Sequence, residues 1–209
     1  MTHNFAYGCC VASWEKFTRN VEPHTHDRLT YATSGHTDIV SAYNDILDSV
    51  YAYDVDGIIL LHDDLEITDP HAEDKFHAAL ATPGVGIVGV AGGGDASIAW
   101  WEHEPIGHQV TDVTTIDFGQ RTGEVGYLEG SILVLSQWAI KHLRFDADFM
   151  GFHGYEEICV RARLAGLKVV VADVDTHHHT QMGFKSQESA ASWRAANEMY
   201  LGKWGTREA

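Results

Sequence analysis

The 209-residue chain is predicted to form a single α/β domain with a mostly parallel mixed sheet flanked by helices. Apolar runs typical of buried strands alternate with stretches of helical periodicity through the first half, which is the pattern of βαβ units. The length suits one α/β domain with a full hydrophobic core, and no linker or change of composition divides it. We therefore treat residues 1–209 as one domain.

The expected elements follow in order. Strands are expected at 5–11, 28–33, 58–61, 84–90, 127–135 and 168–172, with short irregular strands between 92 and 117. Helices are expected at 14–21, 39–50, 71–81, 136–143, 155–165 and about 186–203. Thr37 or Asp38 can cap the helix at 39–50. Trp193, Ala196 and Tyr200 recur at helical spacing, which suits packing on the domain or on a second copy, so a homodimer stays open.

Charge and composition narrow the class of partner. There are 14 Lys and Arg residues against 30 Asp and Glu residues, a net charge of −16. Such a surface repels phosphate backbones and anionic membranes, so neither is an expected partner, although a modified nucleic-acid base as acceptor is not excluded. No apolar run approaches a membrane span, no signal peptide is recognisable, and the three cysteines form no paired framework. A cytoplasmic protein is expected.

An acidic turn follows the third expected strand. The apolar run Ile58–Leu61 leads directly into His62, Asp63 and Asp64. Adjacent carboxylates beside an imidazole repel one another and lose hydration, which is costly unless a cation or a hydrogen-bond network compensates. Such oxygen ligands suit Mg²⁺ or Mn²⁺, and the carboxyl ends of strands are where α/β sheets bind ligands. The alternative is a solvated acidic turn.

Several motifs then occur in a recognisable order between residues 5 and 183. They are AYN at 42–44, LHDD at 61–64, GIVGVAG at 86–92 with Trp100 and Trp101, GYLEGSILVL at 126–135, Phe145-Asp146, GFHGYEEICVRARLAG at 151–166, and the histidines 177–179. In this order the chain resembles glycosyltransferases of the GT-A fold near family 2. It most resembles the glycosyltransferase-like family 2 group that includes the StrF-type domain.

This resemblance implies a nucleoside-diphosphate sugar as donor, with uridine diphosphate as the family default. It also implies a divalent metal, Mn²⁺ or Mg²⁺, and transfer of the sugar to an acceptor hydroxyl with inversion. The alternative is a non-catalytic module of the same fold that binds a nucleotide sugar or glycan. A zinc hydrolase built from His62, Asp64 and the later histidines is disfavoured, because no HExxH spacing is present.

The metal ligands are assigned through the resemblance. The usual Asp-x-Asp motif is here His62-Asp63-Asp64, which makes Asp64 the expected ligand, Asp63 a contact to sugar or ribose hydroxyls, and His62 a neighbour of the metal. A histidine after the last core strand is a further ligand in such enzymes. Neighbours in an extended segment point to opposite sides, so at most His177 and His179 share one side. His177 is favoured, and a polar histidine-rich turn is the alternative.

The resemblance also implies a carboxylate base that accepts the proton of the acceptor hydroxyl. Glu156 and Glu157 are the candidates, at a helix N-terminus where the helix dipole favours negative charge. The alternative is that they stabilise the helix, since Glu157 can pair with Arg161 four residues on. That pairing leaves Glu156 freer, so Glu156 is favoured as the base.

Donor contacts are expected by analogy at the remaining motif positions. Val11, Ala12 and Ser13, at the end of the first strand, would border the nucleotide. The other expected contacts are Asn44, Glu129, Gly130 and Trp101. Trp100 and Trp101 would stack on a sugar or base, or would instead belong to the core or a dimer contact.

Overall fold

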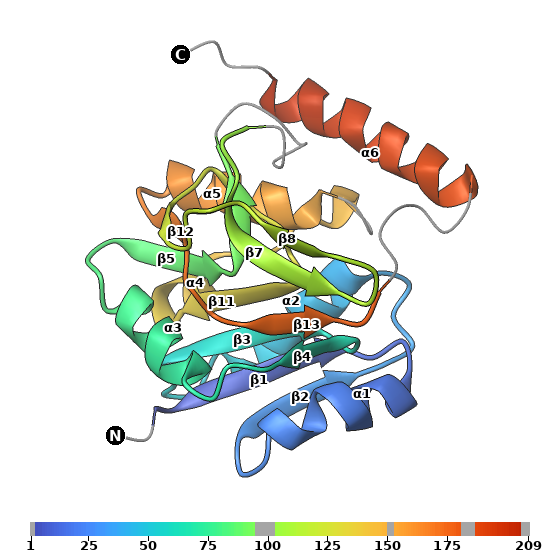
Figure 1. Ribbon diagram of the computed structural model, residues 1–209. Helices are drawn as coiled ribbons and strands as arrows, with labels where there is room; N and C mark the ends of the chain where they lie inside the picture. Colours follow the sequence, from blue (N-terminus) through green and yellow to red (C-terminus); the bar gives the residue numbers. More distant parts are fainter. Residues whose placement is uncertain (1–2, 95–102, 150–152, 181–186, 206–209) are drawn as a thin grey trace.

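The computed structural model describes residues 3–94, 103–149, 153–180 and 187–205, and its strands form two sheets (Figure 1). The main sheet has seven strands in the order β2-β1-β3-β11-β5-β12-β9. Their bounds are β1 Phe5–Cys10, β2 Leu29–Thr33, β3 Gly57–His62, β5 Val85–Gly89, β9 Gly123–Glu124, β11 Ile132–Ser136 and β12 Lys168–Val171. Strands β2, β1, β3, β5 and β12 share one direction, while β11 and β9 run against them. The expected mostly parallel mixed sheet is confirmed.

Helices cover both faces of the main sheet. Alternation along β3 sends Ile58 and Leu60 to one apolar cluster and Ile59 and Leu61 to the other. The first cluster includes residues of α2 (Ile39–Val50), α4 (Gln137–His142) and α5 (Gly154–Leu164), and the second includes residues of α1 (Trp14–Asn20) and α3 (Ala72–Leu80). The described connections also contain the short 3-10 helices η1 (Glu22–His24) and η3 (Ala147–Phe149).

The start of α2 resolves the choice between two cap residues. Asp38 caps this helix, because its Oδ1 accepts a hydrogen bond of 2.8 Å from the backbone N–H of Ser41. The cap satisfies one of the N–H groups that have no partner inside the helix. Hydrogen bonds from Ser41 offset the effect of burial and hold the pKa of Asp38 below its usual value. The carboxylate therefore stays charged at the helix N-terminus.

A second sheet, not foreseen as a unit, gathers the segments expected to be irregular together with the histidines. Its order is β10-β6-β7-β13-β4, with β8 paired to β7. The bounds are β4 Leu65–Ile67, β6 Ala91–Gly93, β7 Ile106–Thr111, β8 Thr115–Asp117, β10 Tyr127–Leu128 and β13 Thr176–His178. Figure 1 shows β7, β8, β13 and β4 in front of the main sheet. Because β13 pairs with β4 and with β7, His177 and His178 lie in a central strand and not in a turn.

The expected strand at 127–135 is wrong as one element. It divides into β10, which belongs to the second sheet, and β11, which belongs to the main sheet. The break falls at Gly130, whose φ of +96° is rarely adopted by other residues. A Cβ there would also lie 2.1 Å from the ring of Tyr155. The break carries the chain from one sheet to the other and sets Glu129 at the junction.

The C-terminal helix, α6 (Gln187–Trp204), packs on this same chain. Its Tyr200 is buried beside Phe149 and Tyr127, with ring centroids 5.8 and 6.3 Å away. Lys203 Nζ donates a hydrogen bond of 3.0 Å to Glu157 Oε1. The sequence left open whether this helix packs on its own domain or on a second copy. It packs on its own domain, and a homodimer stays a prediction. No helix in the part of the chain described here is long and apolar enough to cross a membrane.

Candidate donor and metal site

The ends of β1 and β3 bring the predicted nucleotide and acidic segments together. These strands are parallel neighbours, and Cys10 is paired with His62 in their register. The residues that follow, 11–13 after β1 and 63–64 after β3, therefore leave the same edge of the sheet. Strand carboxyl ends of this kind are where α/β folds bind ligands.

Asp63 fastens these two strand ends to one another. Its Oδ2 accepts hydrogen bonds from the backbone N–H groups of Ala12, at 2.8 Å, and Ser13, at 2.6 Å. Ser13 in turn caps α1 through its hydroxyl, and the N–H of Val11 donates to Thr33 of β2. One carboxylate oxygen thus fixes the loop that was expected to border the nucleotide.

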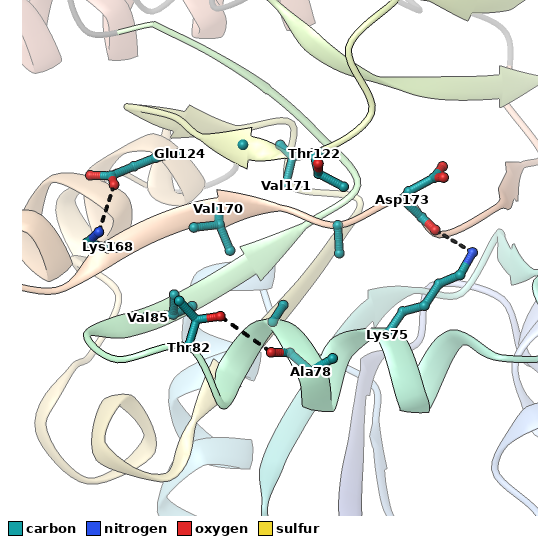
Figure 2. Close-up of a pocket in the computed structure, with 13 residues that line it drawn as sticks. Lys75, Ala78, Thr82, Val85, Thr122, Glu124, Lys168, Val170, Val171 and Asp173 are labelled. Carbon is teal, nitrogen blue, oxygen red and sulfur yellow. Dashed lines mark hydrogen bonds and ion pairs between the residues drawn. The ribbon is translucent and has the colours of Figure 1, made fainter.

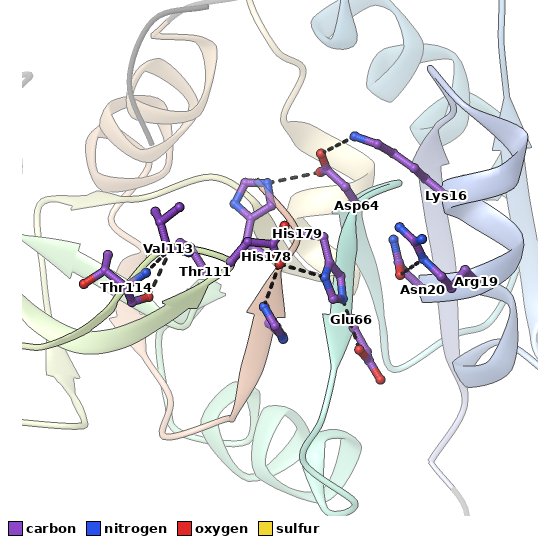
Figure 3. Close-up of polar contacts among 12 residues, drawn as sticks. Lys16, Arg19, Asn20, Asp64, Glu66, Thr111, Val113, Thr114, His178 and His179 are labelled. Atoms are coloured by element: carbon purple, nitrogen blue, oxygen red, sulfur yellow. Dashed lines mark hydrogen bonds and ion pairs between the residues drawn. The ribbon is translucent and has the colours of Figure 1, made fainter. Parts of the chain in front are cut away.

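Asp64 has side chains as partners instead of backbone amides. Its Oδ1 lies 3.1 Å from His178 Nε2, and its Oδ2 accepts a hydrogen bond of 2.9 Å from Lys16 Nζ (Figure 3). Burial would raise the pKa of Asp64, but the hydrogen bonds from His178 and Lys16 outweigh it and hold the pKa well below its usual range. Asp64 is therefore an ionised carboxylate at neutral pH.

His62 completes a cluster with Asp64 and His178. Its Nε2 lies 2.8 Å from the hydroxyl of Tyr155, and its ring meets that of His178 edge-on with centroids 5.4 Å apart. Burial, followed by the neighbouring His178, lowers the pKa of His62, which keeps the imidazole neutral. Each of His62, Asp64 and His178 offers a ligand atom within 4.8 Å of the others, and we call these three residues the inner cluster.

The histidine beside Asp64 differs from the one favoured by the sequence. The structure brings His178, not His177, to Asp64, because the register of β13 on β4 sets His178 opposite Leu65, beside Asp64. His177 and His179 share the other side of the strand, where their rings stack with centroids 4.1 Å apart. The expected alternation of the three side chains is confirmed, and His178, not the favoured His177, is the histidine that contacts Asp64.

Glu129 and Gly130 lie beside the inner cluster. Glu129 Oε1 accepts a hydrogen bond of 2.8 Å from Gln109, and Oε2 accepts from the N–H and the hydroxyl of Ser131. Burial lowers the pKa of His178, but the hydrogen bond that His178 donates to Asp64 and the negative charge of Glu129 together raise this pKa above its usual value. Gly130 contributes by its missing side chain, which lets the ring of Tyr155 approach and reach His62.

The two glutamates of α5 have different surroundings. The expected pairing of Glu157 with Arg161 is confirmed, with Oε1 accepting at 2.7 Å from Arg161 Nε and at 3.0 Å from Lys203, and the Glu157 side chain is fully buried. Glu156 is 9% exposed, and its Oε1 lies 3.6 Å from His153 Nδ1. Among the residues the structure describes, Glu156 Oε2 has no hydrogen-bond partner, and neither does the second oxygen of Glu157.

Two other predicted donor contacts have different outcomes. Asn44 uses both ends of its amide on the backbone of Phe145, at 2.9 Å each, and so ties α2 to the loop before α5. Trp101, with Trp100, lies outside the described residues.

Sequence reasoning missed Lys16, Tyr155 and Gln109. A signal for Lys16 existed, because it lies three residues after Ser13, the cap residue, on the first turn of a helix that starts beside the acidic turn. Tyr155 and Gln109 had no comparable signal, since their roles depend on contacts between distant segments.

A cavity of about 500 Å³ lies elsewhere, between α3 and β12 (Figure 2). Its lining is mainly aliphatic, with Lys75 and Asp173 at one end and the Lys168–Glu124 pair at the other (Figure 2). None of the predicted site residues lines it.

Comparison with solved structures identifies the fold. The structure of GalNAc-T7 with UDP, GalNAc and Mn²⁺ matches with a TM-score of 0.62 at 8% sequence identity, covering 99% of this chain and 51% of that one. The crystal structure of A197 from STIV matches with a TM-score of 0.56 at 11% identity, covering 85% of this chain and 86% of that one. The fold is the GT-A fold.

Sequence comparison then gives the family. The Streptomyces griseus protein described as streptomycin biosynthesis protein StrF is 31% identical over 201 residues, which is 90% of this chain and 70% of that protein. The chain belongs to the StrF family of GT-A, family 2-like proteins. No family model matches it.

Proposed function

We propose that this protein is a metal-dependent glycosyltransferase. It moves a sugar from a nucleoside-diphosphate sugar, with uridine diphosphate favoured, to an acceptor hydroxyl with inversion. The observation that carries the proposal is the inner cluster at the carboxyl end of β3, where an ionised carboxylate and two imidazoles converge. Membership of the StrF family and the UDP and Mn²⁺ in the GalNAc-T7 structure support it.

The donor set of the inner cluster fits a divalent ion. Asp64 Oδ1 and His178 Nε2 are 3.1 Å apart, and His62 is kept neutral by burial, so a lone pair is available on each imidazole once His178 gives up its proton. Two imidazoles beside one carboxylate suit Mn²⁺ better than Mg²⁺, which prefers oxygen. When bound, the metal neutralises charge that builds on the leaving diphosphate.

Residues around the inner cluster would hold the donor. Lys16, whose side chain is 37% exposed and already reaches Asp64, is placed to contact the diphosphate. Asp63 Oδ2 accepts the hydrogen bonds from Ala12 and Ser13, so we assign Oδ1 to a contact with a ribose or sugar hydroxyl. Glu129 and Gly130 would face the sugar.

Glu156 is assigned as the base. As the acceptor oxygen bonds to the anomeric carbon and the bond to the diphosphate breaks, the hydroxyl proton passes to Glu156, and the nucleoside diphosphate leaves. Support comes from the contrast with Glu157, whose Oε1 is held by Arg161 and Lys203. Glu156 Oε1 instead lies 3.6 Å from His153 Nδ1.

Calorimetry tests the donor site. A panel of nucleoside diphosphates is titrated with Mn²⁺ and with chelator into wild type, Asp64→Ala and the control Glu124→Gln, which changes an exposed carboxylate outside the site. We expect one nucleotide to bind only with metal, with at least tenfold weaker binding in Asp64→Ala and no change in the control. Equal binding with chelator, or in Asp64→Ala, would refute the metal site.

Turnover separates the enzyme from a binding module of the same fold. Release of nucleoside diphosphate from the bound donor is followed with water or small hydroxyl acceptors. Slow donor hydrolysis that depends on Glu156 supports the transferase, whereas tight binding with no release under any condition supports the module.

A further inference from the structure

The opposite side of β13 from the inner cluster carries a second group of metal-ligand side chains. His177 and His179 lie on this side, with Glu66 on one neighbouring strand and Asp112 just beyond the end of the other. We call these four residues the outer cluster. It shares no residue with the inner cluster, and the proposed transfer reaction does not use it.

Distances within the outer cluster are those of converging ligands. Asp112 Oδ1 lies 3.1 Å from His177 Nε2 and 3.1 Å from His179 Nδ1. Neighbouring ligand atoms around a tetrahedral zinc ion with bonds of about 2.0–2.1 Å are about 3.3 Å apart. Glu66, His177 and His179 also offer ligand atoms within 4.8 Å of one another. Without a metal, the same contacts are hydrogen bonds between imidazole and carboxylate.

Glu66 supplies the orienting contact that metal-bound histidines usually have. Its Oε2 lies 3.2 Å from Nε2 of His179, the ring nitrogen opposite the one that faces Asp112. Ligating histidines commonly donate their second N–H to a carboxylate, which fixes the tautomer and the ring direction. His179 Nδ1 is thereby left to face Asp112, 3.1 Å away.

The backbone holds these groups in place before any ion arrives. The register of β13 on β4 sets His177 directly opposite Glu66. Asp112 lies in the β7–β8 turn, where the N–H groups of Val113 and Thr114 donate to the hydroxyl of Thr111 (Figure 3). The side chains are between 23% and 46% exposed, so an ion can enter from solvent.

We propose that the outer cluster is a second divalent-metal site, which takes a transition metal of the zinc class through His177, His179 and Asp112, with Glu66 orienting His179. Two imidazoles with two carboxylates carry a charge of about −2 when the histidines are neutral, which a divalent ion balances. Nitrogen ligands favour Zn²⁺, Co²⁺ or Ni²⁺ over Mg²⁺. An ion there joins β13 to the turn after β7, and so braces the strand that supplies His178.

Titration with Zn²⁺ and Co²⁺ tests the proposal in the full chain. All variants carry Asp64→Ala, which removes the inner carboxylate, so the result does not depend on the donor site. We expect one equivalent of Zn²⁺ by calorimetry and visible absorption bands from bound Co²⁺. Adding His177→Gln and His179→Gln should abolish the Co²⁺ bands and weaken Zn²⁺ binding at least tenfold. The control pair His26→Gln and His71→Gln removes two exposed histidines and should change neither the bands nor the affinity.

A second variant guards against loss of folding. Asp112→Asn with Glu66→Gln keeps both imidazoles and changes only the carboxylates, and it too should weaken Zn²⁺ binding at least tenfold. Zinc should also raise the melting temperature of the Asp64→Ala chain but not of this variant. Equal stoichiometry and affinity in the control and either outer-cluster variant, or no Zn²⁺ bound by the Asp64→Ala chain, would overturn the proposal.

Discussion

The chain contains two pairs of adjacent acidic residues, Asp63-Asp64 after β3 and Glu156-Glu157 in the first turn of α5. In both pairs the two members have different hydrogen-bond partners. One member of each pair has an oxygen held by the protein itself: Asp63 by backbone N–H groups and Glu157 by Arg161 and Lys203. Asp64 instead contacts two titratable side chains, and Glu156 lies 3.6 Å from His153 in place of a close contact with Arg161 or Lys203. Neighbours of the same chemical type thus have different partners, and the reaction proposed above uses the member that is not fixed by backbone N–H groups or by Arg161 and Lys203.

The largest effect is expected from the available glutamate. Glu156→Gln should lower kcat roughly 10²–10⁴-fold, since an amide cannot accept the acceptor proton. Donor binding and the free energy of unfolding should change little, because Glu156 makes no strong contact that the amide would lose. Initial rates at saturating donor, compared with the melting temperature, measure both. A wild-type rate in this variant would remove Glu156 from the reaction.

The structural glutamate should show the reverse. Glu157→Gln should lower the free energy of unfolding by about 2–3 kcal/mol, because it replaces a fully buried charge that pairs with Arg161 and Lys203. This loss of stability is smaller than for an ion pair whose members are all buried. Arg161 and Lys203 are each about a third exposed, so water can hydrate them when the carboxylate is removed. Urea denaturation measures it. A loss of rate at unchanged stability would mean that the two glutamates have the opposite roles.

The smallest effect is expected at Asp63, the member of the other pair that joins the strand ends. Asp63→Ala removes the acceptor for two N–H groups and should cost about 1–2 kcal/mol. Asp63→Asn keeps a carbonyl oxygen in that place and should recover most of this loss. The comparison of the two variants by denaturation isolates the fastening contact from the charge. Equal destabilisation by both would show that the charge of Asp63 matters more than its acceptor oxygen.

Much of the fold followed from local pattern. The cap at Thr37 or Asp38, the helical spacing of 39–50 and the buried run of β3 depend on neighbours in the chain; the helix and the strand are confirmed, and Asp38 is the cap. The break at Gly130 was missed, because an apolar stretch on both sides looks continuous and a positive φ leaves no mark in the residue type beyond glycine itself. The second sheet was missed because its strands are short and pair with distant partners.

The candidate site was foreseen in part. Asp63, Asp64 and His62 were identified by the turn they form, and alternation correctly separated His178 from its neighbours. Which of the three histidines lies beside Asp64 could not be derived from sequence, because it depends on the register between β13 and β4, which only the folded sheet defines. The partners of Asn44, Lys16 and Tyr155 likewise arise only when separate segments meet.

The sequence separation of these contacts orders the events of folding. Asp63 meets its partners across 50 and 51 residues, whereas Asp64 meets His178 across 114 and His62 meets Tyr155 across 93. Longer loops cost more entropy to close, and during synthesis the later partner must first leave the ribosome. A nascent chain that ends before β13 can already join its first strands through Asp63, yet it lacks His178 of the inner cluster. The inner cluster is therefore completed late, after the framework that carries it.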